Sequence, residues 1–202
     1  MQSTRLRIRA RQLSDMRAPI PFLAMVAALL TLSSALHAQD VANPHAQALM
    51  KFQDQVETYV ALHKAAEAQL PALKTTNSPA DITTHQHLLA DKIRRQRGNA
   101  GQGTIFSRDV SQEFRRLAAV PLQGINGSRV HKSLKRAEPV VARLEANTPY
   151  PENLPLQSIP PTLLENLPKV PPEVDYRIVG HALILRDVAA NLIVDYVPDA
   201  IP

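Results

Sequence analysis

Proline is concentrated in one stretch of this chain, where nine of the 34 residues from 139 to 172 are Pro. Proline lacks a backbone N–H and its ring clashes with the preceding helical turn, so this stretch can hold neither a long helix nor a central strand. Apolar residues still recur through it, and a disordered linker would contain few of them. We therefore predict an extended belt that lies over the helices, with one short helical turn near residues 162–166. The recurring apolar residues are Leu154, Leu156, Ile159, Leu163, Leu164, Leu167 and Val170.

Residues 39–138, before the belt, predict three to four helices. The clearest runs from Asn43 to Leu70. Asn43 can cap it, Pro44 suits the first helical position and Pro71 stops it. Apolar residues three and four apart form one stripe, which suits a helix packed inside a bundle as well as a coiled coil between two chains, and we favour the bundle. The stripe consists of Leu49, Phe52, Val56, Tyr59, His63, Ala66 and Leu70.

Three further segments have helical patterns. The second helix begins after the cap Ser78 and ends at Gly98. The third covers residues 107–120 and ends at Pro121, and a short fourth helix covers residues 128–137. The predicted inward residues are Ile82, Leu89 and Ile93 in the second helix, and Val110, Phe114, Leu117 and Ala118 in the third.

The chain ends in β structure, because short β-branched and apolar runs alternate with turn residues. A tight turn at residues 180–181 and a longer one at 187–191 join three strands into an antiparallel meander. So small a sheet needs a surface to pack on, and the helices are the candidate. The expected contacts are Tyr176, Ile178, Leu183, Leu185, Ile193 and Val194. The predicted class is α+β, mostly helical, with residues 39–202 as a single domain: a helical part to 138, the Pro-rich belt to 172 and a meander from 173.

Residues 1–38 resemble a signal peptide. Five arginines precede the apolar run from Ile20 to Leu36, and the small residue Ala38 stands at the expected cleavage site. An uncleaved anchor is the alternative, although the run is at the lower limit for crossing a bilayer. Met16 would open a shorter signal, so the true start is Met1 or Met16. We expect export, to the periplasm or the medium, and no membrane-spanning segment after cleavage.

Charge argues against a nucleic-acid partner. The chain has 23 basic and 18 acidic residues, but residues 39–202 have 18 and 17, a net charge of +1. Residues 91–138 carry +7 and residues 139–202 carry −4. This uneven charge has two interpretations. Either the two parts face each other or are simply solvated, or the basic part binds an anionic envelope surface or an envelope protein. The candidates for an anion-facing surface are Arg94, Arg95, Arg97, Arg115, Arg116, Lys132, Lys135 and Arg136.

Catalytic and metal-binding patterns are not found in the sequence. The chain has no Cys, so it offers no disulfide, thiol nucleophile or thiolate ligand. The glycine-rich loop at residues 98–103 lacks the Lys-Ser/Thr of a phosphate loop. Asp187, Asn191 and Asp195 are either cation ligands or turn residues, and the turn is favoured. We predict no catalytic residue, metal ligand or cofactor, and expect His63 to be a core residue.

The ending Y-R-I-V-G-H-A-L-I-L-R-D-V-A-A-N-L-I-V-D, residues 176–195, resembles that of small exported bacterial proteins of unassigned function, with a helical half and a Pro-rich stretch before it. The ending is also similar to that of periplasmic proteins of the nickel–cobalt homeostasis type. The resemblance implies export and no known activity. We expect a non-enzymatic binding or structural envelope protein. The alternative is a periplasmic stress or metal-homeostasis factor, which would bring together His63, His85, His131 and His181.

Overall fold

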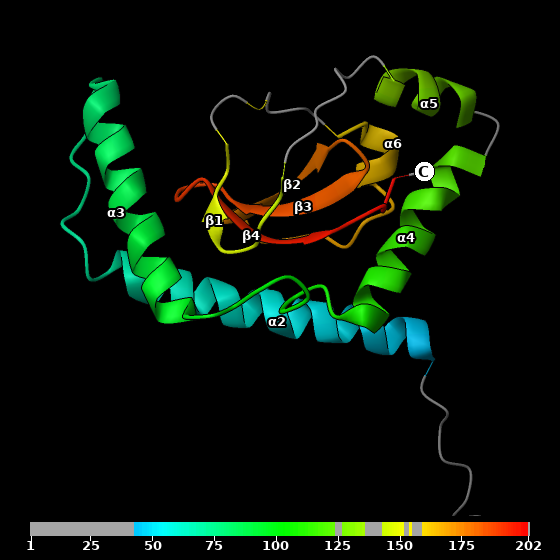
Figure 1. Cartoon of the computed structure of the whole chain (residues 1–202), viewed down its shortest axis with the longest axis horizontal. Coiled ribbons are helices and arrows are strands. Elements are labelled where there is room, and N and C mark those ends of the chain that lie inside the picture. Colours follow the sequence, from blue (N-terminus) through cyan, green and yellow to red (C-terminus); the bar gives the residue numbers. More distant parts are fainter. Residues whose placement is uncertain (1–42, 124–126, 136–142, 152–153, 155–158, 202) are drawn as a thin grey trace, which may run out of the picture. The chain divides into compact units, whose positions relative to one another are not determined.

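The computed structural model describes residues 43–123, 127–135, 143–151, 154 and 159–201 (Figure 1). The predicted signal peptide lies outside the described residues. In the described part, five helices and a four-stranded antiparallel sheet confirm the predicted α+β class.

Helix α2, Pro44–Glu67, follows the predicted pattern. The Oδ1 atom of Asn43 accepts the backbone N–H of His45 at 3.0 Å and so caps the first turn. The helix ends at the cap residue Ala68, before the predicted end at Leu70. Five residues of the predicted stripe are buried, whereas Leu49 and Leu70 are half-buried. The buried five are Phe52, Val56, Tyr59, His63 and Ala66.

Helix α3, Pro79–Arg97, has the predicted Ser78 cap and ends at Gly98, whose φ is 56°. Its buried residues, Leu89, Ala90 and Ile93, all lie in its second half. Ile82 in the first half is 47% exposed, so its predicted inward position is wrong. In Figure 1, α2 runs along one side of the sheet. Helices α3 and α4 lie at the two ends of α2 and point away from it.

Helix α4, Arg108–Gln123, continues through Pro121, so the predicted end at this proline is wrong. Only two residues follow Pro121 in the helix, so the missing N–H removes a bond from the last turn and not from the middle. Helix α5 spans Gly127–Lys135 and helix α6 spans Pro161–Leu164, close to the predicted fourth helix and short turn.

The sheet has the order β1-β4-β3-β2. Its strands are β1, Thr148–Pro149; β2, Val174–Val179; β3, Ala182–Asp187; and β4, Leu192–Val197. The first strand was not predicted: Thr148 and Pro149 of the belt pair with Ile193 and Leu192 of β4. A proline is tolerated here because β1 is an edge strand, where one N–H can be missing from the ladder.

Both faces of the sheet are covered. One face joins the helices in a core that includes Phe52, Phe114 and Leu185. The other face packs Ile184 and Ile193 against belt residues, among them Tyr150 and Leu154. The predicted contact of Ile193 with the helices is therefore wrong, because alternate residues of a strand point to opposite faces. The belt covers the face of the sheet that the helices leave open.

Candidate functional site

A cleft of about 860 Å³ lies where the end of α3 meets the belt. Its walls come from three segments that are distant in sequence: the last turns of α3, the loop at residues 98–102, and residues 143–148 beside β1. Tyr196 of β4 also lines it, and its hydroxyl donates to the carbonyl of Leu144 at 3.2 Å. The cleft is thus built where helix, sheet and belt converge.

Three arginines line this cleft, Arg94, Arg95 and Arg143. Arg94 is held in place, since its Nε donates to the carbonyl of Asn147 at 3.1 Å and its Nη1 lies 3.3 Å from Asp91 Oδ1. Arg95 and Arg143 are exposed, and the side chain of neither forms a hydrogen bond or ion pair with another described residue. Among the described residues, nothing occupies these two guanidinium groups of the cleft.

A buried carboxylate fixes the glycine-rich wall of the cleft. Asp195 of β4 is 0% exposed, and its Oδ2 accepts the backbone N–H groups of Ile105 and Phe106, each at 2.8 Å. Its Oδ1 accepts those of Gly103 at 3.0 Å and Tyr196 at 2.8 Å. Gly103 has a φ of 90°, which suits glycine. One side chain thus ties the loop after α3 to the last strand.

Arg97, the last residue of α3, contacts the core and strand β4 and does not line the cleft. Its guanidinium lies 5.2 Å from the centre of the Tyr59 ring and donates to the carbonyl of Val194 at 3.0 Å. Burial lowers the pKa of Arg97, while the nearby Tyr59, Asp195 and Asp187 oppose this effect. This arginine is used inside the fold.

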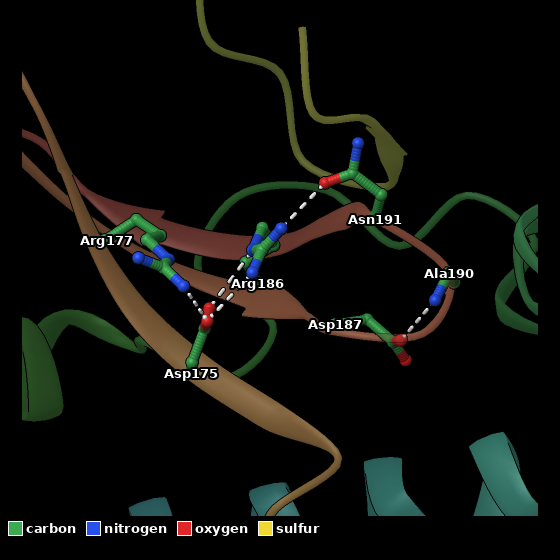
Figure 2. A network of polar contacts seen from close by, with 6 residues as sticks. All are labelled: Asp175, Arg177, Arg186, Asp187, Ala190 and Asn191. Atoms are coloured by element: carbon green, nitrogen blue, oxygen red, sulfur yellow. Dashed lines mark hydrogen bonds and ion pairs between the residues drawn. The ribbon is translucent and has the colours of Figure 1, made fainter. Parts of the chain in front are cut away.

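A second buried carboxylate joins α2 to the turn after β3. Asp187 is 0% exposed, and its Oδ2 accepts the hydroxyl of Tyr59 at 2.6 Å and lies 2.6 Å from Nδ1 of His63. Its Oδ1 accepts the N–H of Ala190 at 2.7 Å, as Figure 2 shows. The bond to Asp187 raises the pKa of His63 against the opposing effect of burial, with Glu67 adding to the rise. Burial, followed by the charge of Asp187, raises the pKa of Tyr59 well above its usual range.

The described residues among the anion-facing candidates lie in different surroundings. Arg94 and Arg95 line the cleft, whereas Arg97 is turned inward. Arg115 donates to the carbonyl of Pro198 at 3.0 Å, and Arg116 pairs with the buried Glu113. Lys132 is exposed on α5; nothing is described of the Lys135 side chain, and Arg136 lies outside the described residues. Arg143 was not among the candidates, because only the fold brings it beside α3.

The histidines occupy separate places in the described part of the chain. His63 is buried on α2, His85 is half-buried on α3, and Nδ1 of His181 lies 2.8 Å from the carbonyl oxygen of Ile201. The side chain of His131 is outside the description. Among the described residues, no group of three His, Cys, Asp or Glu side chains could hold a metal ion. Asp195 accepts backbone N–H groups, and Asp187 contacts the Tyr59 and His63 side chains and the N–H of Ala190, as turn and loop anchors do.

Of the helices that the structure describes, none combines the length and apolar character needed to cross a membrane. The resemblance to small exported proteins stays a prediction. Searches against protein-family models, curated proteins and solved structures find no match for this chain.

Proposed function

We propose that this protein is exported and acts as a non-enzymatic binding protein, and that its cleft takes a carboxylate or phosphate group of an anionic envelope polymer. The observation that carries the proposal is the pair Arg95 and Arg143, which line one cleft from segments far apart in sequence and have no partner among the described residues. A guanidinium presents planar, paired donors that match the oxygens of carboxylate and phosphate.

The rest of the cleft suits a polar, hydroxyl-bearing ligand. Asn99 and Gln102 contribute amide groups, and Thr148 contributes a hydroxyl. Asp91 and Glu145 also line the cleft, and the C-terminal end of α3 carries partial negative charge. The net attraction for an anion is therefore small, and binding is expected to be weak and salt-sensitive.

Binding can be measured with two probes that separate the possible sources of the anionic group. Polygalacturonate supplies carboxylates, and phosphatidylglycerol vesicles supply phosphates, with phosphatidylcholine vesicles as the neutral reference. We expect the double variant Arg95→Gln, Arg143→Gln to lose binding to whichever probe the protein recognises. Arg129→Gln, which removes one positive charge at an exposed position of α5, is the control. Equal binding by all three proteins, or binding to neither probe at low salt, would show that the cleft is not the site.

Export has its own test, because it rests on the sequence of residues 1–38 alone. N-terminal sequencing of the protein recovered from the periplasm or the medium is expected to begin at or near Gln39. An intact N-terminus in the membrane fraction would favour the uncleaved anchor.

A further inference from the structure

Strand β2 is an edge strand of the sheet. It pairs with β3 on one side, and on its other side the described residues provide no neighbouring strand. The pairing of β2 with β3 shows which backbone groups of β2 are already hydrogen-bonded. Val188 N donates to Glu173 O at 2.9 Å, and Val179 pairs with Ala182 beside the tight turn. Since hydrogen-bonded positions alternate along an antiparallel pair, the N–H and C=O groups of the odd-numbered residues face β3. Those of Tyr176 and Ile178 face outward.

A groove of about 720 Å³ runs beside this edge. Four consecutive residues of β2, Val174 to Arg177, line it. Because successive side chains of a strand point to opposite faces, a groove lined by consecutive residues follows the edge and not one face. The opposite wall comes from residues 159–170 and includes Leu164, which is 49% exposed. The described residues therefore leave room along the edge.

The charges of this edge are arranged around Tyr176. Asp175 and Arg177 flank it and point to the same face of the sheet, where Asp175 lies between Arg177 and Arg186 (Figure 2). Nη2 of Arg186 lies 2.8 Å from Oδ2 of Asp175. The Nε atom of Arg177 is buried and has no hydrogen-bond partner among the described residues. A buried donor without an acceptor is unusual in a folded protein.

We propose that this edge pairs with the same edge of a second copy of the chain, antiparallel and centred on Tyr176. In that register the two Tyr176 residues exchange N–H···O bonds, and the N–H of Ile178 in each copy donates to the C=O of Val174 in the other. The N–H of Val174 takes no part, because it already donates to the carbonyl of Pro171 at 3.1 Å. Asp175 of each copy then stands opposite Arg177 of the other, and opposite charges across a strand pair are stabilising. Shifting the centre by one residue places two Asp175 or two Arg177 side chains opposite each other. The charges therefore select one symmetric register, as an isologous dimer requires.

The test uses charge swapping on protein expressed from the full chain. Sedimentation velocity over a concentration series that reaches about 1 mM is expected to show a monomer–dimer equilibrium. Arg177→Glu places a Glu opposite Asp175 in both symmetry-related pairs of the dimer. It is expected to weaken the dimer about tenfold. Asp175→Lys places Lys opposite Arg177 and weakens it likewise. An equimolar mixture of the two variants restores both opposite-charge pairs and is expected to form a heterodimer of wild-type strength. The exposed Arg129→Glu is the control for net charge.

A measurement on the unaltered protein covers the case in which Asp175→Lys fails to fold, which circular dichroism would show. The backbone amides of Tyr176 and Ile178 are expected to exchange with solvent more slowly as the protein concentration rises, while that of Val197 in β4 does not change. A monomer at every concentration would overturn the proposal. A dimer that Arg177→Glu leaves intact would do the same, as would amide exchange at Tyr176 that is independent of concentration.

Discussion

His63 and Asp187 are 124 residues apart in the sequence, yet Nδ1 of the histidine lies 2.6 Å from Oδ2 of the carboxylate, and both side chains are buried. Tyr59, one helical turn before His63, donates to the same oxygen. This contact joins the middle of α2 to the end of β3. It is a buried polar link between the helical half and the meander on the helix side of the sheet.

Replacing Asp187 tests the strength of this link. Asp187→Ala leaves His63 and Tyr59 buried without their acceptor, and removing one partner of a buried pair costs about 3–5 kcal/mol of unfolding free energy. Urea unfolding would measure the loss. Lys51→Met is the control, because it breaks an exposed ion pair with Asp109 and is expected to change stability little. Equal effects of the two substitutions would contradict the buried link.

The same pair makes stability depend on pH. The pKa of His63 is raised above its usual 6.5 because Asp187 accepts its hydrogen bond, and the charges of Asp187, Glu67 and Glu173 add to the rise, while burial opposes it. A raised folded-state pKa means that the stabilisation is complete below pH 6.5 and is lost as the pH rises through the folded-state value.

Urea midpoints measured between about pH 6 and pH 9 are therefore expected to fall with rising pH in the native protein. In His63→Gln the glutamine does not titrate, so this part of the slope is expected to disappear. An identical slope in both proteins would assign the pH dependence to other groups.

Phe52 tests the aromatic core. Its side chain is 0% exposed, and its ring centre lies 4.7 Å from that of Phe114 and 5.5 Å from that of Phe106. Phe52→Ala is expected to cost about 3–5 kcal/mol, because it removes these contacts and leaves a cavity. Met50→Ala, two residues away and 62% exposed, is the control. A thermal unfolding curve that Phe52→Ala leaves unchanged would mean that the stripe is not core.

Asp195 tests the wall of the cleft. In Asp195→Asn one carboxylate oxygen becomes an NH₂ group, which faces backbone donors and cannot accept their bonds. We expect a cost of about 1–3 kcal/mol and faster exchange of the Ile105 and Phe106 amides. Asp199→Asn, an exposed change nearby, is the control. Unchanged exchange at Ile105 would show that the loop holds its shape without the carboxylate.

The sequence predicted the elements whose signals are local. Asn43 and Ser78 cap their helices as expected, and Gly180 forms the tight turn with a φ of 58°. Two features that involve prolines were not predicted: the continuation of α4 through Pro121 and the short strand at Pro149. Pro121 sits in a last helical turn and Pro149 in an edge strand, and at such ends the missing N–H is tolerated. The position of a proline within its element is set by the fold and not by the neighbouring residues.

The candidate site was predicted only in part, because its parts are distant in sequence. Arg94 and Arg95 were recognised from the basic segment, but Arg143 reaches the cleft only after the belt has packed beside β4. Asp195 looked like a turn residue, since nothing near it shows that three amides of the loop at residues 103–106 are its partners.

The two buried carboxylates also determine when the chain can finish folding. The partners of Asp187 and Asp195 in α2 and in the loop after α3 belong to residues 59–106, and each lies at least 89 residues before the carboxylate that binds it. A polypeptide emerges from the ribosome with its N-terminus first. Tyr59, His63 and the amides of the loop after α3 therefore lack these acceptors until Asp187 and Asp195 have been synthesised. Contacts of such long sequence separation are slow to form. The helical half is thus the part of the newly made protein that most needs protection from proteases and from self-aggregation.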